Sequence, residues 1–432
     1  MVSKRYANPN YVLTPLRRVI HTAQYGISLP ATEEPIGIPM IRMNNLQNDG
    51  WDLTDLKYIE LSEKEAELYR VNSGDILFNR TNSKELVGKC EVFGEEGDWV
   101  FASYLIRIVL DQTKAIPKFV STFLSTKAGR IQIDRVSRQI IGMSNVNAEE
   151  LQDLLIPLPP IEIQRSLVAE IEAARQSRKQ KLAQADELLS SLDGYLLDQL
   201  GLNMPQKSDK KVFAMSLRKV RSAQRIDVDY FHPERIIAIR EQEDRTELHS
   251  KCLAEFVDFV RHTISDYTSA SYIGMANVQR NTGELVESND KETEGKSFAF
   301  IEDDILFARL RPYLNKVYRA ERTGVCSTEF HVIRIKEEYR NEILPDYLAT
   351  ILRSSLILAQ TKHMMTGNTH PRLANEDVIN LVVPTPELEI QERLVIEVKH
   401  RRTEVRRLRQ EAETEWESAK THFERKLLGE EE

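Results

Sequence analysis

The stretch "IPLPPIEIQ" at residues 156–164 is repeated as "VPTPELEIQ" at residues 383–391, with five of nine positions identical. The prolines in both stretches favour extended backbone and cannot lie inside a helix. Pro160 suits the first position of a helix, and Glu162 suits the positive end of the helix dipole. The repeated stretch therefore predicts a joint between a strand and a helix, used twice in one chain.

Upstream segments repeat in the same order. "DILFNR" at residues 75–80 returns as "DILFAR" at 304–309, and "LIRI" at 105–108 is similar to "VIRI" at 332–335. Further pairs are "IRMNNLQNDG" (41–50) with "IGMANVQRNTG" (273–283), "IPKFVSTFLST" (116–126) with "LPDYLATILRS" (344–354), and "YANP" (6–9) with "YFHP" (230–233). Offsets drift by a few residues, as loop insertions would cause. The pattern predicts an internal duplication with pseudo-two-fold symmetry.

Downstream of each joint, apolar and small residues recur at the three-and-four spacing of a heptad seam, interrupted in the first copy by Arg178. The seam positions are Leu167, Ile171, Ala174, Leu182, Ala185, Leu189, Leu192, Leu196 and Leu200, and then Leu394, Val398, Val405, Ala412, Trp416, Ala419, Phe423 and Leu427. Helices of about 40 residues, about 60 Å long, follow from this spacing. A single amphipathic helix cannot bury its own seam, so the two helices are predicted to pair as an antiparallel coiled coil.

The predicted fold class is therefore α+β, with two mixed α/β domains alternating with two long helices. The predicted boundaries are residues 1–155 and 205–383 for the mixed domains, and residues 156–204 and 384–432 for the helical spacers. Within the first mixed domain, "KFVSTFLSTKAGRIQI" (118–133) fits one helix.

Composition limits the compartment and the function. The chain has 432 residues, 41% of them hydrophobic, and no apolar run of membrane-spanning length. Its N-terminus lacks the apolar core of a signal peptide. The scattered cysteines Cys90, Cys252 and Cys326 fit a reducing cytoplasm and exclude a disulfide framework or a cysteine-based zinc site. The net charge of −8 means that DNA binding would rest on local basic patches or on partners.

Enzyme signatures are incomplete. "NPNY" (8–11) is one substitution from the Asn-Pro-Pro-Tyr signature of amino-methyltransferases, but Asn10 breaks it and no glycine-rich cofactor loop occurs. A nuclease site at "PD" (345–346) and "QTK" (360–362) lacks its second carboxylate. His363 and His370 show no metal spacing and are predicted to be polar surface. The chain is therefore predicted to have no catalytic site, bound cofactor or metal.

The arrangement resembles the specificity subunit of type I restriction–modification systems. The resemblance rests on the two proline-rich joints with their helices, on "DILF" in each copy, and on "RIDVDYFHP" (225–233) at the start of the second copy. The first copy departs from the pattern, because "RYANPNYVL" (5–13) has no full counterpart of "SLRKVRSAQRID" (216–227) before it.

The resemblance implies two target-recognition domains, each reading one half of a split double-stranded DNA sequence. It implies helices that act as a spacer and dock two adenine methyltransferase subunits, which would use S-adenosylmethionine, together with restriction (motor–nuclease) subunits. The charged helix face at residues 401–417 is a candidate docking surface. Two alternatives remain open: a protein-bridging scaffold without DNA readout, which the acidic charge favours, and the specificity component of a related defence system.

Loops in which basic and amide side chains cluster are the candidates for DNA contact, because such groups can pair with base edges and phosphates. In the first copy they are Arg42, Asn44, Asn45, Arg80, Asn82, Lys127, Arg130, Arg138, Ser144 and Asn145. In the second copy they are Asn277, Arg309, Arg311, Tyr313, Asn368, Thr369, His370 and Arg372.

Overall fold

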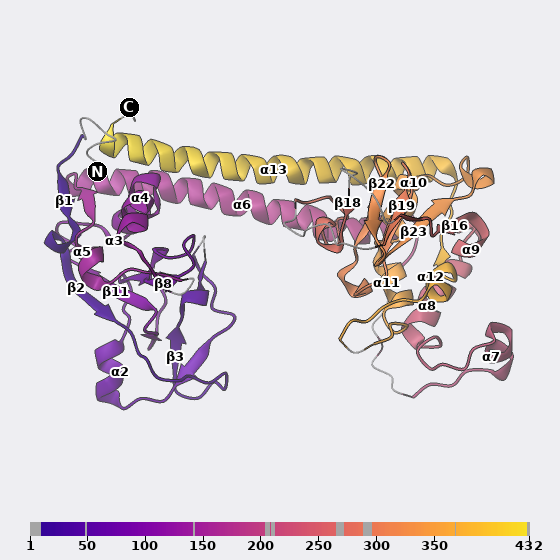
Figure 1. Cartoon of the computed structure of the whole chain (residues 1–432), viewed down its shortest axis with the longest axis horizontal. Coiled ribbons are helices and arrows are strands. Elements are labelled where there is room, and N and C mark those ends of the chain that lie inside the picture. The colour runs from indigo at the N-terminus through magenta and orange to yellow at the C-terminus, as the bar shows by residue number, and fades with distance from the viewer. Residues whose placement is uncertain are drawn as a thin grey trace. The chain divides into compact units, whose positions relative to one another are not determined.

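The computed structural model describes residues 10–47, 50–140, 143–203, 208, 212–264, 272–287, 296–367 and 369–429 (Figure 1). The chain forms two compact units. Unit 1 comprises the residues up to 183 together with those from 408 onward, and unit 2 comprises residues 184–407. Two long helices, α6 (Ile161–Gln199) and α13 (Leu388–Leu428), contribute one segment each to both units. Each unit thus combines a mixed α/β domain with two helical segments.

Unit 1 is built on a four-stranded antiparallel sheet in the order β2-β11-β7-β9. Its strands are β1 (Leu13–Pro15), β2 (Ile20–Tyr25), β3 (Ile38–Ile41), β4 (Leu46–Gln47), β5 (Gly50–Trp51), β6 (Lys57–Ile59), β7 (Ile76–Asn79), β8 (Thr81–Asn82), β9 (Cys90–Val92), β10 (Val100–Phe101), β11 (Leu105–Leu110), β12 (Arg138–Ile140), β13 (Met143–Asn145) and β14 (Leu155–Pro157). Its shorter helices are α2 (Glu63–Tyr69), α3 (Pro117–Ser125), α4 (Lys127–Val136) and α5 (Ala148–Gln152). Alternation along β11 sends Ile106 and Ile108 into a core that also contains Phe119 of α3, Ile171 of α6 and Phe423 of α13.

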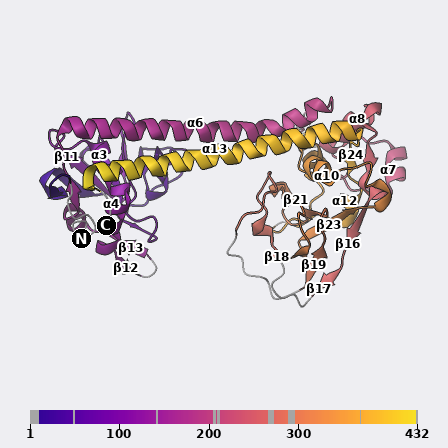
Figure 2. The same cartoon turned by 90° about the horizontal axis from the view of Figure 1, so that it is seen from above.

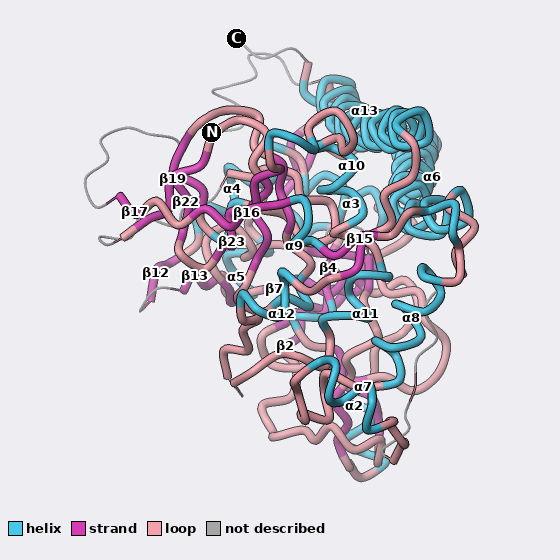
Figure 3. The backbone as a smooth tube through the Cα atoms, turned by 90° about the vertical axis from the view of Figure 1, so that its right-hand side faces the viewer, coloured by secondary structure: helices cyan, strands magenta, loops and turns pink. Residues whose placement is uncertain are grey.

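Unit 2 contains a similar four-stranded antiparallel sheet, β16-β23-β20-β21, and a second sheet in the order β17-β19-β22-β18. Its strands are β15 (Lys251–Cys252), β16 (Val257–Val260), β17 (Thr263–Ile264), β18 (Tyr272–Ile273), β19 (Ser297–Phe300), β20 (Ile305–Ala308), β21 (Val317–Arg319), β22 (Gly324–Ser327), β23 (Phe330–Ile335) and β24 (Val382–Val383). Its shorter helices are α7 (Leu217–Ala223), α8 (Pro233–Glu243), α9 (Leu253–Phe256), α10 (Pro345–Ile351), α11 (Ser355–Thr361) and α12 (Asn375–Ile379). Helices α8 and α11 pack against each other (Figure 3).

The predicted joints are confirmed. In unit 1, β14 pairs with β1 and is followed by α6; in unit 2, β24 pairs with β15 and is followed by α13. At each joint a fully buried glutamine, Gln164 or Gln391, accepts one hydrogen bond and donates two, all from or to backbone groups. The partners are Ile116 N (2.9 Å), Lys114 O (2.9 Å) and Pro159 O (2.9 Å) for Gln164, and Leu344 N (3.0 Å), Glu342 O (2.8 Å) and Pro386 O (2.7 Å) for Gln391. The same side chain therefore holds the same turn of backbone in both copies.

The predicted single helix over residues 118–133 is wrong, because the chain forms α3 and α4 with a break at Thr126. Thr126 has extended backbone, and its hydroxyl accepts a hydrogen bond from Gly129 N (3.4 Å), so it starts a new helix. A Cβ at Gly129 would lie 2.4 Å from Phe123 O, so the glycine permits the close approach of the two helices. A local cap therefore overrides the continuous apolar pattern.

The heptad seam is buried or half-buried along its length. Among the predicted seam positions none is exposed, and Ala185 and Ala412 have no accessible surface. In unit 1 the segments of α6 and α13 lie side by side and run antiparallel (Figure 1 and Figure 2), since Arg178 pairs with Glu413 at 3.3 Å and Lys181 with Glu411 at 3.1 Å. The interruption at Arg178 is thus compensated by a carboxylate on the facing helix.

The helical segments of unit 2 also contact each other through polar side chains. Arg401 of α13 stacks over the ring of Tyr195 of α6 at 4.4 Å and donates to the hydroxyl of Ser191 at 3.2 Å. Among the described helices, none combines the length and apolar character that crossing a membrane requires.

Candidate nucleic-acid interface

The "DILF" strand of each unit begins at a buried aspartate, Asp75 or Asp304, whose side chain holds the turn before it and an arginine on the neighbouring strand. The hydrogen bonds are Asn72 N to Asp75 Oδ2 (2.8 Å), Arg107 Nε to Asp75 Oδ2 (2.6 Å), Ile301 N to Asp304 Oδ2 (2.8 Å) and Arg334 Nη2 to Asp304 Oδ2 (2.7 Å). The start of the strand is fixed in the same way in both units. The end of the strand, which carries Arg80 in unit 1 and Arg309 in unit 2, therefore takes an equivalent position within each unit.

Arg80 and Arg309 are held by their backbone between two loops. The bonds are Arg80 N to Tyr104 O (3.0 Å), Val146 N to Arg80 O (2.9 Å), Arg309 N to Glu329 O (2.9 Å) and Leu373 N to Arg309 O (3.0 Å). In each unit these bonds join the strand end to the loop before the next long strand and to the segment before a short helix. Segments that are 20 to 66 residues apart in sequence are thereby brought into one surface.

We define the first recognition surface as Asn44, Arg80, Asn82, Arg138 and Asn145. Asn82, Arg138 and Asn145 lie on one three-stranded sheet, β12-β13-β8. The Arg80 guanidinium donates to Asn145 Oδ1 at 3.2 Å. The amide of Asn82 contacts the sulfur of Met43 at 3.7 Å, which places the exposed Asn44 nearby in the chain.

Arg138 is the most available cation of the first recognition surface. Its side chain is 73% exposed, and its only described ion pair is with Glu150 at 2.7 Å. The Arg138 side of this pair is open to solvent, which screens the pair and limits its contribution to stability, whereas the Glu150 side chain is only 17% exposed and also accepts a hydrogen bond from Asn147 N. Beside Asn44, a cavity of about 460 Å³ opens between residues 27–31 and 102–104.

We define the second recognition surface as Arg309, Arg311, Tyr313, Thr369, His370 and Arg372. A bridge between Leu310 and Arg372 joins the loop after β20 to the loop after α11, and a bridge between Thr366 and Arg372 closes the second loop on itself. Arg311 N also donates to Pro371 O at 2.7 Å. Arg311 has a left-handed backbone (φ +48°), and its side chain and that of Tyr313 are exposed.

The charge of Arg372 is compensated internally. Its guanidinium donates two short hydrogen bonds to Glu329, at 2.7 and 3.0 Å, which lower the pKa of the Glu329 carboxyl and raise that of Arg372. Beneath this pair, burial and the nearby charge of Arg309 lower the pKa of His331 to about 4, so this ring is neutral at pH 7. The bonds to Glu329 occupy Nε and Nη2 of Arg372, so a base contact through these two nitrogens requires Arg372 to leave Glu329.

Several predicted contact residues serve the fold. Asn45 and Asn277 each accept a hydrogen bond at 2.9 Å from a backbone N–H three residues earlier, and Asn45 is buried. Ser144 is buried as well. Arg130 donates to the backbone of residues 84–87. These side chains hold loops in place, and Asn45 and Ser144 have no surface to offer a ligand.

Three further predicted residues lie outside the two surfaces. Arg42 pairs with Asp55 at 3.0 Å and its side chain is only 19% exposed. Lys127 is exposed at the first residue of α4. Asn368 lies outside the described residues.

Two tyrosines beside the first recognition surface, Tyr25 and Tyr104, are not among the contact residues predicted from the sequence. Tyr25 lies under the Arg80 guanidinium at 4.7 Å, and its hydroxyl accepts from Ala148 N at 2.8 Å, so it positions the arginine. Tyr104 is 48% exposed and lines the cavity beside Asn44. The position of Tyr104 directly before "LIRI" was the available signal, since an aromatic residue in a loop between strands is a frequent contact residue.

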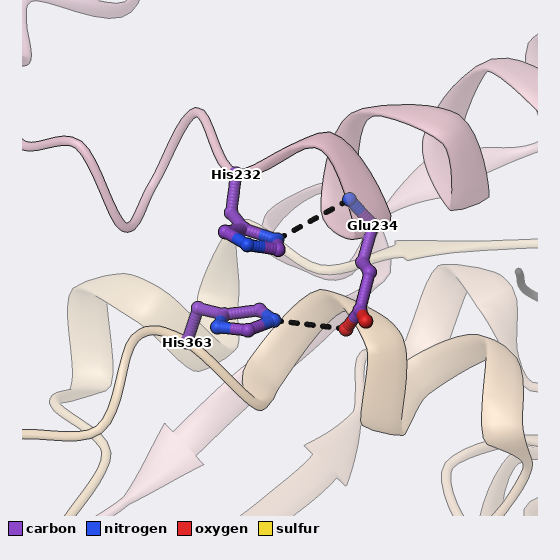
Figure 4. Close-up of side chains that lie close together, drawn as sticks. All are labelled: His232, Glu234 and His363. Atoms are coloured by element: carbon purple, nitrogen blue, oxygen red, sulfur yellow. Dashed lines mark hydrogen bonds and ion pairs between the residues drawn. The ribbon is translucent and has the colours of Figure 1, made fainter. Parts of the chain in front are cut away.

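His232, Glu234 and His363 form a polar cluster whose potential ligand atoms lie within 4.8 Å of one another (Figure 4). Although burial favours the protonated carboxyl, a hydrogen bond from Ser208 N and contacts from His363 and Lys362 lower the pKa of Glu234 to about 2. The two imidazole rings stack with centroids 3.4 Å apart. A metal ion would have to displace the Lys362 ammonium, 3.1 Å from the carboxylate, so we interpret the cluster as an anchor for the loop that follows His363.

Part of the chain matches a known protein family. Residues 24–184 match the model of the type I restriction modification DNA specificity domain. The chain is 26% identical over 156 residues to the putative type I restriction enzyme MjaX specificity subunit of Methanocaldococcus jannaschii, covering 35% of this chain and 36% of the relative. It is 26% identical over 164 residues to the type I restriction enzyme EcoKI specificity subunit of Escherichia coli K12, covering 37% of this chain and 34% of the relative. The matched stretch thus spans about a third of these curated relatives.

The fold also has a solved counterpart. A chain in a structure on complex assembly and conformational transition of the type I R-M system aligns over 98% of both chains, with a TM-score of 0.54 and 14% sequence identity. At this identity the match establishes similarity of fold.

Proposed function

We propose that this chain, which belongs to the specificity subunits of type I restriction–modification systems, is the non-catalytic DNA-recognition subunit of such a complex. In this proposal each unit reads one half of a split double-stranded site. The observation that carries it is the matched placement of Arg80 and Arg309, each held at the end of a "DILF" strand between two loops that carry amide and cationic side chains.

The chemistry of the two surfaces suits major-groove readout. Arginine pairs with two acceptors of guanine, and asparagine with the acceptor and donor of adenine. The first recognition surface offers both types through Arg138 and Asn44, whereas the second is dominated by arginines and Tyr313. We therefore expect the two half-sites to differ in sequence.

The two copies are proposed to descend from a duplicated unit, with α6 and α13 forming a coiled-coil spacer that sets the length of the unread gap. The pairing of Arg178 with Glu413 and of Lys181 with Glu411 supports this proposal. Deleting one heptad from each helix, residues 178–184 together with a facing segment of α13, should shorten the unread gap or abolish assembly. The ion pairs make residues 408–414 the matching segment of α13. If the unread gap between the two half-sites kept its length after such a deletion, the proposal that the helices set this length would be contradicted.

The partners are proposed from the family. Two adenine methyltransferase subunits, using S-adenosylmethionine, would dock on the helices, and restriction (motor–nuclease) subunits would join them. The shared supply of positive charge from such partners would offset the net charge of −8 of this chain on DNA.

A genome-wide map of adenine methylation tests the proposal. Cells expressing the chain with its neighbouring methyltransferase are compared with cells that lack the chain. A split motif methylated on both strands only in the presence of the chain is the expected result. An unchanged methylation map, with the methyltransferase shown to be present and active, would overturn it.

The net charge of −8 favours one alternative function, a scaffold that bridges proteins without reading DNA. Binding of the assembled complex to DNA at two salt concentrations separates the two, because readout of a duplex weakens steeply with salt and depends on sequence. Binding that ignores sequence would favour the scaffold.

A further inference from the structure

A cavity of about 520 Å³ in unit 2 lies between α10 and the first part of α13, and none of its lining residues belongs to the second recognition surface. It is lined by more basic than acidic side chains. The basic ones are Arg319, Arg353, Lys399, Arg402 and Arg406, and the acidic ones are Glu284, Glu321 and Asp346. Five cations against three anions leave an excess of two positive charges.

Three of the five cations have carboxylate partners. The pairs are Lys399 with Asp346 (2.6 Å), Arg319 with Asp303 (2.6 Å) and Arg406 with Glu284 (3.8 Å). Asp303 lies outside the lining and Glu321 takes part in none of these pairs, so counting all four carboxylates leaves an excess of one positive charge. Arg353 and Arg402 are the two cations without a carboxylate partner among these pairs.

Arg353 and Arg402 are bound to neutral groups. Arg353 donates to Val317 O at 2.8 Å and to the Thr350 hydroxyl at 3.3 Å, and Arg402 donates to Thr282 O at 2.6 Å. The Nε of Arg402 is buried without a hydrogen-bond partner. Within the described ranges, no carboxylate lies within the 4.0 Å of an ion pair from either guanidinium.

Holding these two charges is costly. Burial lowers the pKa of Arg353 well below its usual value, and the positive charge of Arg402 lowers it further. Burial lowers the pKa of Arg402 as well, and the more distant carboxylates of Glu284 and Asp346 offset only part of this effect at both arginines. Arginine stays protonated in proteins. The lowered pKa values thus express an electrostatic cost that an anion in the cavity would relieve.

Unit 1 has the missing carboxylate at the same place. Arg175 lies eleven residues after Gln164, as Arg402 lies eleven after Gln391, and Arg175 pairs with the buried Glu91. Glu91 faces Leu77 across its strand pair in β9, and the equivalent position in β21 is Tyr318. Unit 2 has therefore kept the arginine without its internal anion.

We infer that this cavity is a binding site for a phosphate-type oxyanion, held by Arg353 and Arg402. Two guanidinium groups present paired N–H donors that match a tetrahedral oxyanion. Inorganic phosphate and the terminal phosphate of a nucleotide share this chemistry. The inference stands apart from DNA readout and does not depend on it.

Titration calorimetry of the full chain tests it, with inorganic phosphate and a nucleoside monophosphate as separate probes at constant ionic strength. Saturable binding of one phosphate group per chain is expected. Comparable affinity for both probes would assign the site to free phosphate, and tighter binding of the nucleotide would assign it to a nucleotide phosphate. Both results support a phosphate-type site.

Two variants of one residue form a matched pair. Thr350→Glu places a carboxylate beside Arg353 without removing either arginine, and it should weaken phosphate binding at least about tenfold, because the internal anion replaces the ligand. Thr350→Gln has nearly the same size without the charge and should bind within about twofold of the parent chain. Thermal unfolding of both checks that they are folded, and Arg402→Gln provides a second route to lost binding.

Three results would overturn the inference: no saturable binding by the parent chain, equal binding by Thr350→Glu and Thr350→Gln, or tighter binding of succinate than of phosphate. The last would assign the cavity to carboxylates.

Discussion

The two joints between mixed domain and long helix agree in one interaction and are inverted in another. Gln164 and Gln391 make the same three backbone hydrogen bonds. Beside them, an ion pair joins the first turn of a domain helix to the long helix. The pair is Lys118 with Glu172 at 3.2 Å in unit 1, and Asp346 with Lys399 at 2.6 Å in unit 2.

The positions of these ion pairs correspond, since Glu172 and Lys399 each lie eight residues after the joint glutamine. A glutamine that satisfies backbone groups has no substitute of opposite polarity, because the positions of N–H and C=O groups are set by the fold. A pair of side chains needs only to be complementary, so its polarity can reverse. The comparison indicates that the two joints share the hydrogen bonds made to backbone groups, while the polarity of the ion pair beside each joint differs between the copies.

The largest expected loss of stability follows from substituting Glu91, and a substitution of Tyr318, at the equivalent position of unit 2, is the comparison. Glu91→Gln should lower the free energy of unfolding by about 3 kcal/mol, because Lys118 and Arg175 lose a shared buried carboxylate. Tyr318→Phe, which removes one hydrogen bond of 3.3 Å, should cost less than about 1 kcal/mol. Denaturant unfolding at pH 7 measures both, and similar losses would refute the distinction.

The same variant has a defined pH dependence. Although burial favours protonation, Arg175 and Lys118 lower the pKa of Glu91 below its usual value. A depressed folded-state pKa contributes stability above the unfolded value of about 4.3, and this contribution is lost as the pH falls through the folded value. The difference in stability between parent and Glu91→Gln should therefore shrink as the pH is lowered from 7 toward 3.

The joint glutamines should behave alike. Gln164→Leu and Gln391→Leu each leave one buried N–H and two C=O groups without their partner, so each should cost about 2–3 kcal/mol in free energy of unfolding. Gln410, which is exposed on α13, is the control, and Gln410→Leu should be nearly neutral. A neutral change at one joint with a large loss at the other would break the equivalence.

The recognition surfaces should act separately. Arg309→Ala should lose about 1–3 kcal/mol of discrimination at one half-site, and Arg80→Ala a similar amount at the other. Binding of the complex to duplexes with either half-site altered measures this. Equal weakening at both halves by one variant would indicate a defect in folding or in general phosphate contact.

The smallest effect concerns the inverted pair. Lys399→Glu should destabilise by about 0.5 kcal/mol, because Asp346 and Lys399 are partly exposed and screened by solvent. Adding Asp346→Lys should recover the loss by restoring complementarity with the polarity of unit 1. Failure to recover in the double variant would mean that the polarity itself is fixed by other neighbours, such as Arg319.

The strand ends and loops of the candidate site were predictable from the sequence, whereas the accessibility and partners of single side chains were not. The sequence located the strand ends and the loops, and the family resemblance is confirmed by the matching domain. It could not tell Asn44 from Asn45, because one side chain is exposed and the other holds its own loop. Nor could the sequence predict that Arg372 would form hydrogen bonds with Glu329, since the two residues are 43 positions apart.

The sequence by itself determined the repeated elements of this protein. Prolines, the buried glutamine and the heptad seam act over a few neighbouring residues, so similar stretches form similar strands, joints and helices wherever they occur. The tertiary structure decided which charges meet. Glu91 reaches Arg175 from 84 residues away, and the corresponding Arg402 has Tyr318 in that place. Such contacts depend on the path of the whole chain, and they make two similar copies different in chemistry.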